Sequence, residues 1–318
     1  MEKERKYSLG MDVGGTNSVF GLVDEDGCVL RTNSVKTAAY ADFDEYVDVV
    51  SARLAALTEG IGGLSSVSGF GIGAPNCNFY TGCILGAPNL PWKGEVPLTA
   101  AFSAKLGIPV RATNDANAAA MGEMIYGRAR GMKNFIEITL GTGVGSGIVV
   151  NGDLLYGCDG FAGELGHVTV ERNGRQCGCG RRGCLETYCS ATGVARTARE
   201  MIETTDMPSL LRNINGREIE SKDVFDAAEQ GDGMALEIFN FTGEILGRAF
   251  ADFIAFSAPE AFILFGGLAK SGEYLLSPVR KAMNECVMPL WRDKVEVLVS
   301  TLDGAHAAIL GAAALCHQ

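Results

Sequence analysis

The residues between Ile138 and Glu186 combine three kinds of chemistry in one short stretch. They include a glycine-rich turn, acidic side chains close to a histidine, and three cysteines at metal-ligand spacing. Glycine turns leave backbone N–H groups accessible to anions, and carboxylates accept hydrogen bonds from hydroxyl groups. We therefore interpret this stretch as the centre of an active site that uses all three.

The cysteines of this stretch predict a structural zinc site. Cys177, Cys179 and Cys184 supply three thiolates, and His167 is the nearest histidine along the chain. Structural zinc takes four thiolate or imidazole ligands, which these residues would complete. A disulfide with one free thiol is the alternative, and a cytosolic setting disfavours it. The predicted role of the ion is to fix the loop that carries His167 and the nearby glutamates.

Two of those glutamates are candidates for binding a polyol. Glu164 and Glu186 lie in a region too rich in glycine for an exposed helix face. Carboxylates on a rigid loop are good acceptors for sugar hydroxyls. The alternative is that both are ordinary surface glutamates.

Two glycine turns each join a pair of predicted strands. Asp12 to Asn17 separates strands 7–13 and 19–23, and Gly141 to Gly143 separates strands 135–140 and 144–150. Neither turn has the Gly-Lys-Ser/Thr of a P-loop or leads directly into a helix. One such turn alone fits an ordinary hairpin equally well. Because the arrangement occurs twice, we interpret it as a duplicated topology with a phosphate chain between the hairpins.

Asn114 and Asp115 follow a predicted strand and open a predicted helix. Asparagine and aspartate are common N-caps, and a carboxylate there is stabilised by the helix dipole. The other interpretation is a general base at the carboxyl end of a strand, facing a cleft. The two are compatible, because Asn114 can cap while Asp115 points outward.

Gly266 and Gly267 end another predicted strand, 261–265, before the chain turns towards a helix. Glycines at such a position allow a ligand to approach the backbone closely. We therefore predict that this turn contacts the base or ribose of a nucleotide.

Composition limits the class of protein. A chain of 318 residues exceeds the size at which one core stops growing, so two domains are expected. A net charge of -11 argues against binding a nucleic acid backbone. No apolar run approaches the ~20 residues of a membrane span, and the start has no signal-peptide core. We expect a cytoplasmic protein, with no membrane partner, whose ten cysteines stay reduced.

Apolar periodicity predicts alternating strands and helices, which indicates an α/β protein. Beyond the strands named above, the pattern predicts strands at 28–35, 67–72, 110–113 and 295–299. The predicted helices are 43–57, 98–106, 116–126, 191–202, 222–230, 234–256, 278–287 and 305–315.

These motifs together resemble the ROK family (repressor, open reading frame, kinase) of sugar kinases, over essentially the whole chain. The residues that carry the resemblance are Asp12-x-Gly-Gly-Thr16, Asn114-Asp115, the run from Leu140 to His167, and the three cysteines. The resemblance implies the two-domain actin-like ATPase and hexokinase (ribonuclease H-like) fold with a zinc-bearing loop. It implies an N-terminal domain at 1–115, a larger domain at 116–302, and a C-terminal helix at 303–318 that packs back on the first domain.

The resemblance also implies an activity, the phosphorylation of a hexose by ATP. Asp115 would be the base that accepts the proton of the sugar hydroxyl, and His167 would bind zinc through one ring nitrogen and face the sugar with the other. The implied sugar-binding residues are Asn89, Asn114, Asp115, Glu164, His167 and Glu186. The implied contacts to ATP and Mg²⁺ are Asp12, which would place the ion, and Gly14, Gly15, Thr16, Asn17, Gly141, Thr142, Gly143, Gly266 and Gly267.

The expected substrate is glucose, phosphorylated at its 6-hydroxyl. The segment Asn89-Leu-Pro-Trp92 and the glutamates beside His167 are most similar to those of bacterial glucokinases. Kinases of N-acetylmannosamine, N-acetylglucosamine, allose and fructose in the family share nearly the same residues and stay as alternatives. A homodimer is expected, because it is common in the family.

Two other classes compete with a kinase. ROK repressors share the fold but carry a DNA-binding domain ahead of the first strand, where this sequence has only about six residues. A chaperone-like or actin-like ATPase is disfavoured by the segment from Gly163 to His167, which resembles a sugar-binding loop. We therefore expect an enzyme that binds no nucleic acid.

Overall fold

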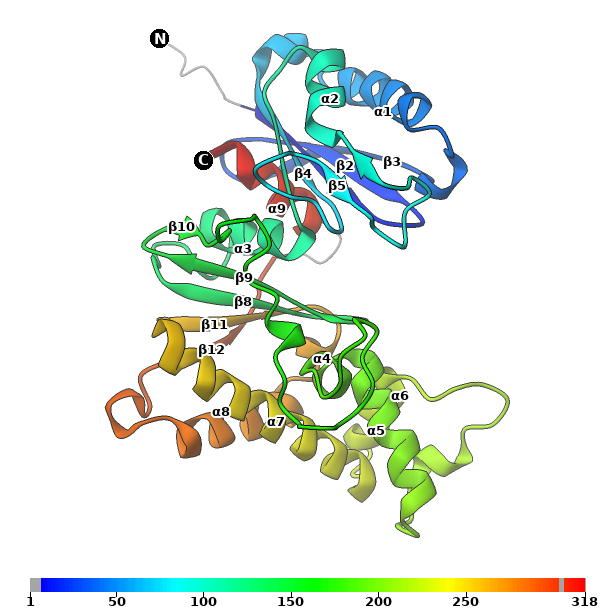
Figure 1. The fold of residues 1–318 in the computed structure, drawn as a ribbon, viewed down its shortest axis with the longest axis vertical. Coiled ribbons are helices and arrows are strands. Elements are labelled where there is room, and N and C mark those ends of the chain that lie inside the picture. The colour runs from blue at the N-terminus through cyan, green and yellow to red at the C-terminus, as the bar shows by residue number, and fades with distance from the viewer. Residues whose placement is uncertain (1–6, 303–305, 318) are drawn as a thin grey trace.

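The computed structural model describes residues 7–302 and 306–317. Within them, two five-stranded sheets lie one above the other, with helices outside each sheet and between them (Figure 1). The N-terminal part of the chain forms the upper lobe, and the residues from about 130 onward form most of the lower lobe. In this part of the chain, no helix is both long and apolar enough to cross a membrane.

The upper sheet has the strand order β3-β2-β1-β4-β7. Its first three strands are antiparallel neighbours, whereas β4 and β7 run parallel to β1. The carboxyl ends of β1, β4 and β7 therefore meet at one edge, where ligands of α/β sheets bind. The strands are β1 Tyr7–Val13, β2 Ser18–Val23, β3 Val29–Val35, β4 Val67–Gly73 and β7 Val110–Thr113.

The lower sheet repeats this topology, with the order β10-β9-β8-β11-β12. Again two antiparallel pairs come first and two parallel pairs follow. The predicted duplication is thus confirmed, and each half opens with a hairpin whose tip is rich in glycine. The strands are β8 Phe135–Leu140, β9 Val144–Val150, β10 Asp153–Leu154, β11 Ala261–Phe265 and β12 Glu296–Val299.

The outer face of the upper sheet is covered by α1 (Phe43–Leu57) and α2 (Leu98–Leu106). Asp42 caps α1, because its carboxylate accepts from the backbone N–H of Asp44 at 2.8 Å. A short hairpin of β5 (Ile84–Leu85) and β6 (Glu95–Val96) lies at the side of the lobe and carries the loop between them.

Two helices, α3 (Asp115–Ile125) and α9 (Ala307–Ala314), lie between the sheets (Figure 1). Although α3 follows a strand of the upper sheet, it packs on β8 and β9 of the lower one, and α9 packs on β1 and β4 of the upper one. The two helices cross where a Cβ on Gly122 would come within 2.9 Å of the Gly311 Cα. Glycine at both positions allows the close crossing that joins the lobes.

Glycines in the upper sheet allow α9 to pack closely on its strands. A Cβ on Gly10 would lie 2.1 Å from the carbonyl oxygen of Ile309, and one on Gly71 would lie 1.8 Å from that of Ala312. The predicted C-terminal segment, 303–318, thus contains a helix that packs on the N-terminal sheet. Residues 303–305 and 318 of this segment, and residues 1–6 of the predicted first domain, lie outside the described residues. The proposed domain boundaries stay a prediction.

Of the remaining helices, α7 packs on the outer face of the lower sheet, where its Phe250 stacks on Phe262 of β11 with ring centroids 4.0 Å apart, and α4, α5, α6 and α8 pack against α7. They are α4 Glu186–Cys189, α5 Ala191–Thr204, α6 Ser221–Glu229, α7 Gly233–Ser257 and α8 Glu273–Cys286. Short 3₁₀ turns occur at Thr37–Ala39, Gly63–Ser66, Leu165–His167, Leu210–Asn213, Leu268–Ser271, Pro289–Trp291 and Leu315–His317.

The predicted start of α8 at Pro278 is wrong, because the helix begins at Glu273 and contains the proline. Proline inside a helix removes a backbone hydrogen bond, which is why the sequence suggested a start there. In the structure the proline ring packs against Gly243 of α7, where a Cβ would come within 2.6 Å of its Cγ. Packing between the two helices offsets the local cost.

Candidate active site

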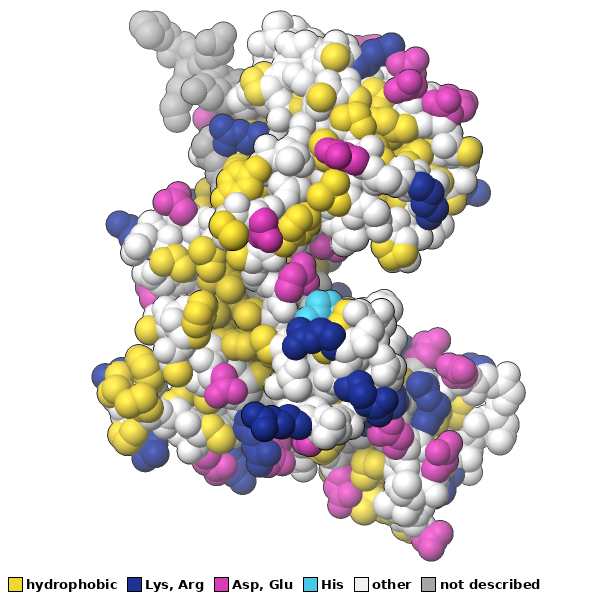
Figure 2. Space-filling view, viewed as in Figure 1, with side chains coloured by type: hydrophobic (Ala, Val, Ile, Leu, Met, Phe, Trp, Pro, Cys, Tyr) yellow, Lys and Arg dark blue, Asp and Glu magenta, His cyan; other side chains and the backbone are white. Residues whose placement is uncertain are grey.

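The predicted site residues come from both lobes and meet where the surface is hollowed between them. Figure 2 shows this cleft, with acidic side chains and a histidine on its walls. The first turn and β7 contribute from the upper lobe, and the second turn and the cysteine loop contribute from the lower one. The two glycine turns, the end of β7 and the cysteine loop, which were expected to form one site, therefore all lie at the cleft.

Asp12 and Asp115 lie on either side of Gly73, a position of β4 that has no side chain. Asp12 at the end of β1 is paired with Gly73 of β4, which is paired in turn with Thr113 of β7. A Cβ on Gly73 would lie 3.6 Å from the Cα of Asp115. The glycine therefore lets the start of α3 pack against the end of β4, and Asp115 lies close enough to Asp12 for the two carboxylates to interact.

The environment of Asp12 makes its ionised form unfavourable. Burial, and secondarily the Asp115 carboxylate, raises the pKa of Asp12 to about 6. A carboxylate in such a place is stabilised by a cation. Asp12 therefore fits a magnesium contact, the role that the family resemblance implies for it.

Of the two roles that the sequence left open, the structure shows the N-cap, which Asn114 fills. The Asn114 side chain caps α3, because its Oδ1 accepts from the backbone N–H of Asn117 at 2.7 Å. Asp115 is the first residue of the helix and is exposed to the cleft. Capping by one residue and outward orientation of the other are thus confirmed.

The first glycine turn approaches the loop of the small hairpin. The backbone N–H of Gly14 donates to the carbonyl oxygen of Asn17 at 3.0 Å, which closes the turn. A Cβ on Gly15 would lie 2.5 Å from the carbonyl oxygen of Asn89. This contact brings Asn89 to the cleft, and the side chains of Thr16 and Asn17 are exposed there.

The second glycine turn is fixed by the start of α5. The Thr192 hydroxyl donates to the carbonyl oxygen of Thr142 at 2.8 Å, and the Ala191 N–H donates to that of Gly141 at 2.8 Å. At the far side of the turn, a Cβ on Gly143 would lie 2.3 Å from Glu186 Oε2. The turn is thus held by the start of α5 on one side and by Glu186 on the other.

Gly266 brings the end of β11 against the end of β8. It has a φ of 103°, and a Cβ there would lie 2.4 Å from the carbonyl oxygen of Leu140. Leu140 is the residue before the second glycine turn, so Gly266 and Gly267 lie beside that turn. This is the arrangement expected if both segments contact one nucleotide.

Glu164 lies at the mouth of the cleft near other site residues. Partial burial raises its pKa, with Asp115 and Glu186 adding to the effect and His167 opposing it. Its loop is tied to β9, because the Ser146 hydroxyl donates to the carbonyl oxygen of Gly163. The candidate base and the candidate sugar carboxylates are therefore close enough to interact.

The residues of the predicted zinc site lie together. One ligand atom from each of the four residues His167, Cys177, Cys179 and Cys184 lies within 4.8 Å of every other. The sulfurs of Cys179 and Cys184 are 3.7 Å apart, and His167 Nδ1 is 3.7 Å from the sulfur of Cys177.

These distances fit a tetrahedral ion. With zinc–sulfur bonds of about 2.3 Å, two sulfur ligands lie roughly 3.8 Å apart. A disulfide would need a sulfur–sulfur distance of about 2.05 Å, and all ten cysteines are free. Because Nδ1 of His167 faces the cluster, its Nε2 is the ring nitrogen left for a second partner.

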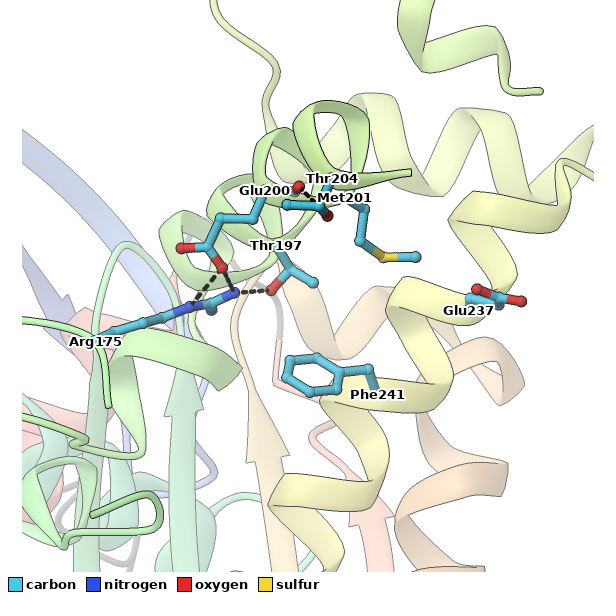
Figure 3. A pocket seen from close by; sticks show the side chains of 7 residues that line it. All are labelled: Arg175, Thr197, Glu200, Met201, Thr204, Glu237 and Phe241. Carbon is cyan, nitrogen blue, oxygen red and sulfur yellow. Dashed lines mark hydrogen bonds and ion pairs between the residues drawn. The ribbon is translucent and has the colours of Figure 1, made fainter. Parts of the chain in front are cut away.

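Two buried charged groups were not anticipated from the sequence. Arg175, in the loop before the cysteines, lines a cavity of about 520 Å³ between α5 and α7, whose lining includes none of the predicted site residues (Figure 3). Glu137 on β8 is fully buried, and burial holds its pKa well above the ordinary range. No short motif marks either residue: the side-chain partners of Arg175 lie 12 or more residues along the chain, and Glu137 accepts from the hydroxyl of Thr139, its neighbour but one.

The chain resembles named proteins along almost its whole length. It is 37% identical over 313 residues to a glucokinase of Thermotoga maritima, which spans 98% of this chain and 97% of that protein. The crystal structure of a ROK family glucokinase from Streptomyces griseus in complex with glucose and AMPPNP is 37% identical, with a TM-score of 0.79 over 98% of this chain and 99% of that one. A xylose repressor of Bacillus spizizenii is 29% identical over 97% of this chain and 76% of its own length.

The duplicated sheets and the cleft with its two glycine turns define a mixed α/β protein with the fold of the ROK sugar kinases. The family model covers residues 8–318, and the chain belongs to the ROK family.

Proposed function

We propose that this chain is an ATP-dependent glucokinase, which transfers the γ-phosphoryl group of ATP to the 6-hydroxyl of glucose. The observation that carries the proposal is the position of Asp115, exposed in the cleft, opposite Asp12 and within electrostatic reach of Glu164. The glucokinases to which the chain is 36–37% identical over nearly its full length support the same activity. The repeated sheets, separated by α3 and α9, support the actin-like ATPase and hexokinase fold.

Asp115 would act as the general base. As the sugar O6 attacks the γ-phosphorus, the O6 proton passes to the Asp115 carboxylate, the new O6–P bond forms, and the bond between the γ-phosphorus and the bridging oxygen breaks to release ADP. Phosphoryl transfer depends mostly on positioning and on stabilising charge. A carboxylate suffices as the base, because proton transfer comes late in a loose transition state.

Five further residues would hold the sugar: Asn89, Asn114, Glu164, His167 and Glu186. The Oδ1 of Asn114 already accepts from the α3 backbone, so its NH₂ group is left to donate to a hydroxyl. Glu164 and Glu186 accept from hydroxyls, and the Nε2 of His167 faces the sugar. Closure of the lobes would exclude water, the competing acceptor.

ATP would lie between the two glycine turns, with its phosphates on their backbone N–H groups. The phosphates would contact residues of both turns: Gly14, Gly15, Thr16 and Asn17 in the first, and Gly141, Thr142 and Gly143 in the second. Gly266 and Gly267 leave room for the ribose or base. Asp12 would hold Mg²⁺, which supplies positive charge for the phosphates.

His167, Cys177, Cys179 and Cys184 would hold a structural zinc ion, whose four filled ligand positions give it no open site for chemistry. When bound, it contributes folding energy to the loop that carries the sugar-binding residues. We place the enzyme in the cytoplasm, because Mg-ATP is its co-substrate and the ligand thiols must stay reduced.

We propose a homodimer as the assembly. Large apolar side chains stay exposed on the lower lobe, among them Phe256 at 75%, Met288 at 54% and Leu290 at 49%. A second subunit would cover such side chains. Sedimentation or light scattering of the purified chain should give twice its 33.5 kDa, and the mass of a single chain at micromolar concentration would refute this part.

The activity is tested by identifying the product. Incubation with Mg-ATP and glucose should yield glucose 6-phosphate, shown by reduction of NADP in the presence of glucose-6-phosphate dehydrogenase. The matched control is 6-deoxyglucose, which lacks the acceptor hydroxyl and should give no more ADP than ATP alone. A phosphate on another hydroxyl, or equal ADP release with the deoxy sugar, would contradict the proposal.

A further inference from the structure

We propose that Arg175 is a positioning residue for sugar binding, which clamps the short helix that carries Glu186 onto α5. The proposal rests on the proposed function, because it matters only if Glu186 holds the sugar. Arg175 lies two residues before the first cysteine of the zinc loop, and its side chain points to the cavity in Figure 3. It touches no proposed substrate contact itself.

The side chain of Arg175 is almost completely buried, and its guanidinium group donates several hydrogen bonds. Its side chain is only 8% exposed. Nε donates to Glu200 Oε2 at 3.1 Å, and Nη2 donates to the same oxygen at 2.5 Å and to the Thr197 hydroxyl at 2.9 Å. A buried charge is tolerated when it is paired in this way, and removing it leaves its partners unsatisfied.

The same guanidinium reaches the helix that carries Glu186. Nη1 donates to the carbonyl oxygen of Thr187, the next residue, at 2.8 Å. The guanidinium carbon also lies 4.5 Å from the centroid of the Tyr188 ring, a distance at which the cation and ring attract each other. Arg175 therefore holds the two residues that follow Glu186.

The backbone around Arg175 completes the clamp. Its N–H donates to the Tyr188 hydroxyl at 3.0 Å. A Cβ on the preceding residue, Gly174, would lie 2.3 Å from that hydroxyl oxygen, so glycine is required for the approach. Tyr188 is thus held at its ring and at its hydroxyl by one residue.

The helix that is clamped cannot hold itself. It has only four residues, Glu186–Cys189, and an isolated helix of that length does not form in water. Glu186 must nevertheless keep one orientation, because its Oε2 accepts from the Val144 N–H at 3.0 Å beside the second glycine turn. The contacts of Arg175 supply the external support that this orientation needs.

The first experiment measures steady-state kinetics of Arg175→Met, which keeps an apolar side chain of similar length and removes the charged guanidinium group. The glucose KM should rise about ten-fold, because several charge-assisted hydrogen bonds are lost, while the ATP KM stays within about two-fold. Zinc content should remain equal to that of the wild type, because no ligand is changed. An unchanged glucose KM, or equal rises in both KM values, would overturn the proposal.

Two further variants keep the test decisive if Arg175→Met folds poorly. Arg175→Lys keeps the positive charge but lacks the planar guanidinium group, and it should give a smaller rise in the glucose KM. Arg196→Met is the matched control, because Nε of Arg196 donates to the other oxygen of Glu200 at 2.8 Å but its side chain is 38% exposed. This variant should leave the glucose KM within about two-fold. A control as impaired as the Arg175 variants would also overturn the proposal.

A readout that needs no catalysis separates this proposal from the proposed function. Hydrogen exchange at the Val144 amide should be faster in Arg175→Met than in the wild type, because that amide is bonded to Glu186. Equal exchange rates would reject the clamp. If the wild type phosphorylates no sugar but exchange still accelerates in the variant, the proposed function fails and the clamp stands as a structural feature.

Discussion

The Glu186 carboxylate accepts a hydrogen bond from the Val144 backbone N–H at 3.0 Å. Val144 opens the strand after the second glycine turn, and Glu186 opens the helix after the cysteine loop. One bond therefore joins the segment proposed to hold phosphates to the segment proposed to hold sugar. This hydrogen bond would help to fix the position of the sugar relative to ATP. That position matters because phosphoryl transfer depends mostly on how the two substrates are placed.

Replacement of the proposed base should separate binding from chemistry. Asp115→Asn keeps the shape of the side chain but cannot accept the proton, so kcat should fall by about 10²–10⁴-fold. Calorimetric binding of glucose should weaken by less than about three-fold, because the amide still bonds a hydroxyl. The control is Asp252→Asn, an exposed position on α7. Near-normal turnover of the Asp115 variant would rule this residue out as the base.

Loss of one zinc ligand should remove the metal and loosen the loop. Cys179→Ser is expected to lower the zinc content to near zero and the free energy of unfolding by an amount on the order of 4 kcal/mol. Elemental analysis and chemical denaturation measure the two quantities. Cys286→Ser, at another exposed cysteine, should change neither. A stable, active and metal-free Cys179 variant would disprove a structural zinc.

Replacement of a sugar-facing carboxylate should affect one substrate more than the other. Glu164→Gln is expected to raise the glucose KM about ten-fold, because charged acceptors form the stronger hydrogen bonds, and to change the ATP KM little. Steady-state kinetics with each substrate varied in turn gives both constants. Glu203→Gln on the exposed end of α5 is the control. Equal effects on the two constants would count against a sugar contact.

The pKa of Asp12 predicts a pH dependence of stability. Its pKa is about 6 in the folded chain against 3.8 as the ordinary value, so the folded state holds the proton more tightly. The resulting stabilisation is complete below pH ~4 and is lost as pH rises through ~6, a change of about 3 kcal/mol. Without Mg²⁺, the wild type should therefore lose stability relative to Asp12→Asn as pH rises from 4 to 7.

Added Mg²⁺ supplies the control for this measurement. At pH 7 the ion should restore stability to the wild type by binding the ionised carboxylate, and it should do little for Asp12→Asn. Denaturation curves with and without the ion, in both chains, give the comparison. A stability difference between the two chains that is constant across pH 4 to 7 would show that Asp12 is not perturbed.

Local patterns predicted the parts of the structure that depend on neighbours in sequence. The two glycine turns lie between paired strands, Asn114 caps α3, and the ligand atoms of the cysteine loop lie together, because spacing and residue type determine each of these. The comparisons confirmed the family that those motifs suggested.

Features set by distant contacts could not be predicted. The crossing of α3 and α9 depends on Gly122 and Gly311, far apart in sequence, and Pro278 lies within α8 because Gly243 makes room for it. The network of Arg175 is similar, since Arg175 lies in a loop and its partners Glu200 and Thr197 lie on α5. A sequence pattern records which residues are polar or apolar, whereas these contacts depend on how whole elements pack.

The assignment of this chain as a glucokinase is tested by ADP formation with Mg-ATP and a panel of sugars: glucose, mannose, fructose, allose, N-acetylglucosamine and N-acetylmannosamine. We predict that glucose has the highest kcat/KM and that this activity is lost in Asp115→Asn. A higher value for an N-acetylated sugar would change the assigned substrate while keeping the residue roles. No ADP above background with any of the six sugars would contradict the assignment of this chain as a sugar kinase.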